Sequence, residues 1–157
     1  LYLIKIRKTI NSSVITNKKG VDNMYKFSKK SLKHLNECDD RLILIANKAI
    51  ERIDFSIIDG ARTEEEAKKN QVKGTSWTNR SKHCRKPKSY AFDFIPYPFK
   101  NWNDLEGFKK VADVLKEEAE KLGIKVRWGG DWNMDGKYDD EIERESYDGG
   151  HFELMEE

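Results

Sequence analysis

Cysteines and long apolar runs are scarce in this sequence. Its 157 residues include two cysteines, Cys38 and Cys84, which are too few for a disulfide framework. We interpret them as free thiols in a reducing compartment, and a single bridge between them is the alternative that the sequence leaves open. No segment approaches the roughly 18 consecutive apolar residues of a membrane-spanning helix. The start of the chain also lacks the apolar stretch of about 7–15 residues found in signal peptides. We therefore expect no membrane span and no signal peptide.

A strong charge of one sign is missing as well. Thirty Lys and Arg residues against 28 Asp and Glu residues give a formal net charge of +2, so the composition predicts no nucleic-acid partner. The mean hydropathy of −0.85 is low, but four Trp, six Tyr and seven Phe supply enough bulk for a core, which argues against wholesale disorder. A chain of this length builds one core rather than two, and we expect a monomer.

The first 23 residues lack the apolar patterning of the rest of the chain, which begins at Met24. We expect residues 1–23 to be a disordered extension and residues 24–157 to form a single domain. The alternative for the extension is an added edge strand over Leu1–Ile6, because Tyr, Leu and Ile favour strands.

Apolar residues at helical spacing predict two long helices. One spans residues 42–53 and begins after Asp39 or Asp40, either of which suits an N-cap. The other is the longest and spans residues 105–122. Asn103 or Asp104 suits its N-cap, and Gly123 suits the left-handed position after it.

Shorter elements complete the predicted fold. Thr63 and Glu66 fit a capping box that starts a third helix, which we expect to end near Gly74. Residues 75–89 and 129–149 are polar and aperiodic, so we interpret them as loops. Aromatic and apolar segments are predicted as strands at 55–58, 90–97, 124–128 and 151–155. This mixture indicates an α+β fold in which helices pack on a small antiparallel sheet.

Two of the three histidines lie in positions that suit a metal. His83 precedes Asp93 by ten residues, and His151 follows Asp148 by three. A catalytic zinc takes three imidazole or carboxylate ligands and leaves a fourth position for water, and His83, Asp93 and His151 meet that requirement. Asp148 is then a candidate general acid/base. On residue type and spacing alone, a solvated loop histidine is the stronger alternative for His83. We interpret His34 as a surface or half-buried imidazole without a metal role.

Five local sequences occur in an informative order along the chain. They are Gly60-Ala61-Arg62, Ser81-Lys82-His83, Ala91-Phe92-Asp93, Trp128-Gly129-Gly130-Asp131-Trp132 and Asp148-Gly149-Gly150-His151-Phe152-Glu153. Together they resemble the M15 metallopeptidases: D-alanyl-D-alanine carboxypeptidases, D-Ala-D-Ala dipeptidases and phage L-alanyl-D-glutamate endopeptidases. The resemblance is closest to the short phage endolysins and runs from about Met24 to the C-terminus. No single piece is specific, but the ordered set is.

The resemblance implies a hedgehog-like peptidase fold with a zinc site at the sheet edge. His83, Asp93 and His151 look like the zinc ligands, and Asp148 matches the general acid/base of the family. Arg62 resembles the arginine that stabilises charge on the tetrahedral intermediate, a role that suits a fixed guanidinium in a dry site. The alternative for Arg62 is a surface arginine beside a helix start.

Three further residues are predicted to contact substrate: Ser81, Trp128 and Tyr147. Ser81 is equally well interpreted as a turn residue, and aromatic residues at strand ends belong to the core more often than to a groove. The sequence departs from the family pattern between the first histidine and the aspartate. The longer connection Cys84–Tyr90 lies there, and Ser89 stands where a glycine is expected. Cys84 therefore enters as a competing soft ligand.

An acidic stretch points to a second metal. Asp131, Asn133, Asp135 and Asp139 match the first, third, fifth and ninth positions of a calcium loop, but Ile142 stands at the twelfth, where glutamate is usual. The sequence supports a calcium site and a solvated acidic turn equally.

These features predict a zinc-dependent peptidase that hydrolyses a stem-peptide bond of bacterial peptidoglycan, namely the L-Ala-D-Glu bond, as a phage endolysin. We expect it to stay in the host cytoplasm until a holin releases it to the wall. The alternatives are a D-Ala-D-Ala carboxypeptidase and, from other classes, a non-catalytic cell-wall-binding module or a zinc-stabilised structural domain.

Overall fold

The computed structural model describes residues 25–72 and 81–156. Two predictions lie outside the described residues: the extension at 1–23, whether disordered or carrying the strand Leu1–Ile6, and the helix end near Gly74. Within the described ranges, no helix combines the length and the apolar character needed to cross a bilayer.

Helices form where capping residues and apolar stripes predict them. The described helices are α2 (Lys29–Leu35), α3 (Asp40–Ile50), α4 (Glu64–Val72), the short 3-10 turn η1 (Lys82–Cys84), α5 (Leu105–Lys121) and α6 (Asp139–Glu143). The carboxylates of Asp39 and Asp104 accept backbone N–H groups in the first turns of α3 and α5. Thr63 and Glu66 exchange both hydrogen bonds of the predicted capping box at α4. Gly123 follows α5 with a φ of 68°, as its predicted position requires.

Two short helices escaped the sequence interpretation. Helix α2 buries little beyond Ser31 and Leu35. Helix α6 lies in the acidic stretch that we interpreted as a loop, and its buried residue is Glu141. Neither helix has enough apolar residues to produce a helical period, so tertiary contacts rather than patterning define them.

Four strands form one antiparallel sheet, which confirms the predicted fold class. The strands are β1 (Phe55–Asp59), β2 (Ala91–Pro96), β3 (Val126–Trp128) and β4 (His151–Leu154). Their order is β1-β2-β4-β3, so the last strand in sequence lies inside the sheet. Asp93 of β2 pairs with Asp59 of β1 on one side and with His151 of β4 on the other. The register therefore sets three ionisable residues in one row across the sheet.

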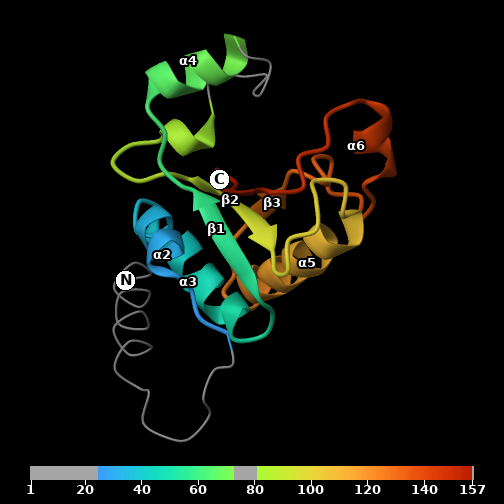
Figure 1. Ribbon diagram of the computed structural model, residues 1–157, viewed down its shortest axis with the longest axis horizontal. Helices are drawn as coiled ribbons and strands as arrows, with labels where there is room; N and C mark the ends of the chain where they lie inside the picture. Colours follow the sequence, from blue (N-terminus) through green and yellow to red (C-terminus); the bar gives the residue numbers. More distant parts are fainter. Residues whose placement is uncertain (1–24, 73–80, 157) are drawn as a thin grey trace, which may run out of the picture.

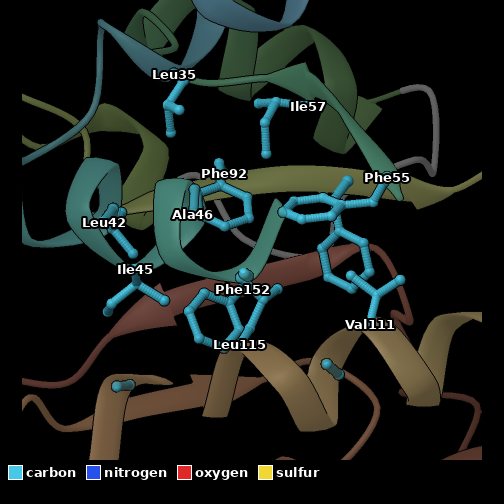
Figure 2. Packing of buried hydrophobic residues seen from close by; sticks show 14 of the residues in the cluster. Leu35, Leu42, Ile45, Ala46, Phe55, Ile57, Phe92, Val111, Leu115 and Phe152 are labelled. Atoms are coloured by element: carbon cyan, nitrogen blue, oxygen red, sulfur yellow. The ribbon is translucent and has the colours of Figure 1, made fainter. Parts of the chain in front are cut away.

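Alternation along the strands divides the sheet into an apolar face and a polar face. Phe152 and Leu154 of β4 are fully buried in the hydrophobic core, while His151 and Glu153 alternate with them. Figure 2 shows side chains from α3 and α5 gathered around Phe92 and Phe152 on the apolar face. Figure 1 shows these two helices together on one side of the sheet, with α4 in green at the opposite end of the molecule. The face away from α3 and α5 is left to carry the polar row.

Candidate metal centre

His83, Asp93 and His151 come together on the polar face of the sheet. One candidate ligand atom from each lies within 4.8 Å of the other two, and in the described part of the chain no other group of three or more His, Cys, Asp and Glu side chains does the same. His83 belongs to the turn η1, whereas Asp93 and His151 are register partners on β2 and β4. The two histidines are 1% and 7% exposed. These are the three residues that the sequence nominated as zinc ligands.

The hydrogen bonds of the two imidazoles point one ring nitrogen of each toward Asp93. His83 Nδ1 donates to the Gly60 carbonyl at 2.7 Å, and His151 Nε2 donates to the Glu153 carboxylate at 2.8 Å. In neutral rings the other nitrogens then carry lone pairs. They lie 3.3 Å from each other, and 3.2 Å and 3.4 Å from Asp93 Oδ1. That oxygen is buried and accepts no hydrogen bond. Three acceptor atoms converging on one point fit a cation, and this set of nitrogen and oxygen donors suits zinc.

Charge at the centre is balanced between acid and imidazole. Burial alone would raise the pKa of Asp93, but the neighbouring His151 and His83 rings lower it well below its usual range. Burial would lower the pKa of His151, but Asp93 and Glu153 raise it to about 9. A metal bound at His151 Nδ1 competes with a proton for that nitrogen, so metal binding should weaken as the pH falls.

Arg62 lies beside the candidate metal ligands and forms ion pairs with Asp59 and Asp93. Its guanidinium donates to Asp59 twice and to Asp93 Oδ2 at 3.3 Å, and its side chain is 14% exposed. Its backbone N–H donates to the His83 carbonyl at 2.8 Å. The predicted strand at 55–58 stops before Asp59, but β1 includes this residue, and an irregularity after Ile57 sets it opposite Asp93. An acid three residues before Arg62 is the signal that could have revealed this pairing.

Asp148 lies on the loop that enters β4. Its backbone N–H donates to the Gly129 carbonyl at 2.8 Å, and its own carbonyl accepts the His151 N–H at 3.1 Å. Although the residue is exposed overall, crowding by protein atoms and the charge of Asp93 raise the pKa of its carboxyl group, against the opposing effect of His151. A raised pKa makes the carboxyl group a better proton acceptor, which suits a general acid/base.

Each of the three predicted substrate contacts has a partner within the protein. The Ser81 hydroxyl accepts the backbone N–H of His83 at 3.2 Å and so caps the turn η1. Trp128 is 2% exposed, and its Nε1 donates to the Gly149 carbonyl at 2.7 Å. Half-buried Tyr147 packs its ring edge-on against Trp128 at 6.1 Å. The prediction that Trp128 lines a substrate groove does not fit this burial, because its indole belongs to the hydrophobic core.

The long connection between His83 and Asp93 is held by protein contacts. Ser89 is fully buried, and its hydroxyl donates to the Ala91 carbonyl at 2.7 Å. The competing ligand Cys84 directs its thiol to the Thr63 carbonyl at 3.6 Å, and the metal-binding group does not include it. The structure therefore gives no support to a cysteine ligand.

In the acidic stretch, backbone N–H groups donate hydrogen bonds to the side-chain oxygens of Asp131 and Asn133. The Asp131 carboxylate accepts the backbone N–H groups of Asp135 and Gly136, each at 3.0 Å. Asn133 Oδ1 accepts the Asp135 N–H at 3.3 Å, and Asp139 begins α6. In residues 25–72 and 81–156, His83, Asp93 and His151 form the only group of three or more His, Cys, Asp and Glu side chains at metal-ligand spacing, and no acid of this stretch belongs to it. The structure gives the calcium prediction no support.

Known peptidases resemble this chain in sequence and in fold. Residues 23–155 match a family model described as phage L-alanyl-D-glutamate peptidase. Over 138 residues the chain is 41% identical to the L-alanyl-D-glutamate peptidase of Escherichia phage T5, covering 83% of this chain and 98% of that protein. A solved structure, the Serratia marcescens L-Ala D-Glu endopeptidase ChiX, superposes with a TM-score of 0.66 at 24% identity, covering 85% of this chain and 93% of that one. At that identity the solved structure supports the fold alone.

Proposed function

The chain belongs to the family of phage L-alanyl-D-glutamate peptidases, and on that premise we propose that it cleaves the L-Ala-D-Glu bond of the peptidoglycan stem peptide with a bound zinc ion. The observation that carries the zinc proposal is the convergence of His83 Nε2, His151 Nδ1 and Asp93 Oδ1. Three protein ligands leave a fourth position for water, whereas structural zinc sites are closed by four. This count favours a catalytic metal over a zinc-stabilised structural domain.

Residues around the centre supply the remaining chemistry of peptide hydrolysis. Zinc, when bound, provides a Lewis acid that polarises the scissile carbonyl and lowers the pKa of water. The Asp148 carboxylate takes a proton from the attacking water and returns it to the departing amide nitrogen. The Arg62 guanidinium, held by Asp59, stabilises the negative charge that develops on the carbonyl oxygen.

Digestion of purified cell walls tests the reaction. Walls are incubated with the protein, clearing is followed by turbidity, and released muropeptides are identified by mass spectrometry. New N-terminal D-glutamate is the expected product. Loss of terminal D-alanine would indicate a carboxypeptidase, and binding to walls without any product would indicate a wall-binding module. His83→Ala is the control, because it removes one predicted ligand and should abolish both zinc content and product.

Further features belong to the same proposal. The single hydrophobic core of the described residues supports one catalytic domain over residues 24–157. We propose that this domain acts as a monomer and reaches the wall through a holin.

Calcium binding by Asp131, Asn133, Asp135 and Asp139 stays a prediction, and calorimetry with millimolar calcium tests it. If no heat of binding is measured, the calcium site should be abandoned.

A further inference from the structure

Glu153 is a buried carboxylate that has no assigned role in the proposed hydrolysis. It lies on β4 two residues after His151, so both side chains project from the same face of the strand. Its side chain is 5% exposed. A buried carboxylate is costly unless charged and hydrogen-bonding partners surround it, so the partners of Glu153 indicate what it does.

Cationic side chains and His151 occupy different oxygens of Glu153. Arg127, its register partner on β3, donates to Oε1 from Nε at 3.0 Å and from Nη2 at 2.6 Å. Lys82 Nζ lies 3.6 Å from the same oxygen. Oε2 is left for His151 Nε2 at 2.8 Å. Arg127 and Lys82 thus hold the carboxylate with one oxygen aimed at the imidazole.

The face of the His151 ring is also confined. The Trp132 ring lies 5.3 Å from the His151 ring at an interplanar angle of 37°, and the Arg127 guanidinium lies 5.1 Å from the Trp132 ring. Arg127 therefore contacts both the carboxylate and the indole that border the imidazole. The ring is fixed at its edge by Glu153 and bordered on its face by Trp132.

We propose that Glu153, held by Arg127 and Lys82, is the positioning residue of the metal centre. It accepts the Nε2 proton of His151 and so presents the Nδ1 lone pair to the metal. The proposal rests on the zinc centre of the proposed function. A carboxylate that accepts the second N–H of a ligating imidazole fixes its tautomer and orientation and increases its basicity. His83 receives the equivalent support from the Gly60 backbone, which no side-chain substitution removes, so Glu153 is where this support can be tested.

Zinc affinity, measured by competition with a chromophoric chelator, tests the proposal without substrate. We expect Glu153→Gln and Glu153→Ala to weaken zinc binding by about 10- to 100-fold, with the larger loss in the alanine variant. Glu118→Gln is the matched control. Glu118 is also buried and pairs with an arginine and a lysine, Arg52 at 2.9 Å and Lys121 at 3.1 Å, but it has no histidine partner. The control variant should keep the wild-type zinc affinity.

The tautomer of His151 provides a readout that loss of a structural ion pair would not change. Long-range proton–nitrogen NMR correlations of the zinc-loaded protein should show His151 protonated at Nε2, and Glu153→Gln should alter that pattern while leaving the His83 pattern unchanged. If Glu153→Ala does not fold, the glutamine variant carries both measurements.

The outcomes separate the two proposals. Wild-type zinc affinity in the Glu153 variants, or an equal loss in Glu118→Gln, overturns the positioning role, as does a wild-type protein that binds no zinc. A protein that binds zinc in a Glu153-dependent manner but releases no muropeptide contradicts the proposed reaction and leaves the positioning role standing.

Discussion

At the scale of single residues, each predicted ligand depends on a partner behind it. His83 rests on the Gly60 carbonyl, His151 on Glu153, and Asp93 receives the Arg62 guanidinium on its other oxygen. These partners direct the remaining donor atoms to one point, which is the preorganisation that metal binding and catalysis need. The centre is therefore a set of paired contacts, and its chemistry should respond to changes one bond away from the ligands.

The acid/base role of Asp148 predicts a separation of metal binding from catalysis. Asp148→Asn should lower the rate of muropeptide release by about 10²- to 10⁴-fold, because the amide cannot shuttle a proton, while zinc content stays at the wild-type level. Zinc content is measured by plasma emission and product release by mass spectrometry. Asp113→Asn on α5, where the carboxylate pairs with Lys109, serves as the control. Near-full activity of Asp148→Asn would remove Asp148 from this role.

The two cysteines should differ in reactivity. Cys38 is fully buried, and burial raises the pKa of its thiol to about 12, so at mildly alkaline pH almost none of it is the reactive thiolate. A thiol reagent should therefore label half-buried Cys84 first and reach Cys38 only after unfolding. Absorbance titration of the native and denatured protein measures this, and Cys84→Ser should lose the early phase. Rapid labelling of Cys38 in the native protein would contradict the burial argument.

At the scale of elements, the geometry of the centre depends on how the turn η1 and the loop that carries Asp148 are placed beside β2 and β4. The turn η1 carries His83, and the Asp148 loop enters β4 immediately before His151. The loop passes so close to Gly129 that a Cβ there would lie 2.4 Å from the Asp148 carbonyl and 2.9 Å from His151 Cβ. Only glycine admits this approach, so Gly129 sets the position of both residues.

Two glycine substitutions should separate site geometry from stability. Gly129→Ala should displace the Asp148 loop and reduce activity by about 100-fold, since a misplacement near 1 Å can have that effect. Gly123→Ala forces a side chain into a left-handed conformation with no neighbour within 4 Å, and should cost roughly 1 to 2 kcal/mol of unfolding free energy. Activity at saturating zinc and urea unfolding are measured on both variants. Equal activity losses would show that the close contact at Gly129 has no special role.

At the scale of the whole molecule, one sheet serves two purposes. Its apolar face joins α3 and α5 in the core, and its polar face carries two of the candidate metal ligands, Asp93 and His151, on the two central strands. Because the ligands come from η1, β2 and β4, a metal that binds the folded chain links segments distant in sequence. Binding to the native state alone stabilises it against unfolding.

Zinc removal should therefore lower the thermal stability of the whole domain. Free zinc at 100 times its dissociation constant contributes about 2.7 kcal/mol, which corresponds to several degrees in Tm for a domain of this size. Calorimetric scans with zinc and with chelator measure the difference. His83→Ala should show the lower Tm in both conditions and no response to zinc. An unchanged wild-type Tm on chelation would contradict a ligand set that spans these three elements.

The local features of the fold could be predicted from the amino-acid sequence. The caps Asp39, Asp104 and Thr63 follow from side-chain hydrogen bonds to nearby backbone, and the α3 and α5 stripes follow from periodicity. The order of the motifs was enough to nominate His83, Asp93 and His151 and to indicate the family. All of these depend on residues near one another in sequence or on a recognisable ordered pattern.

How those residues act together depends on contacts between distant segments, which the sequence did not predict. Strand pairing put Asp59 beside Asp93 and Arg127 beside Glu153, and burial assigned Trp128 to the core rather than to a groove. The ring nitrogen that each histidine turns toward the metal centre follows from Gly60 and Glu153. These outcomes depend on register, burial and contacts between segments far apart in the chain, and residue type and spacing do not encode them locally.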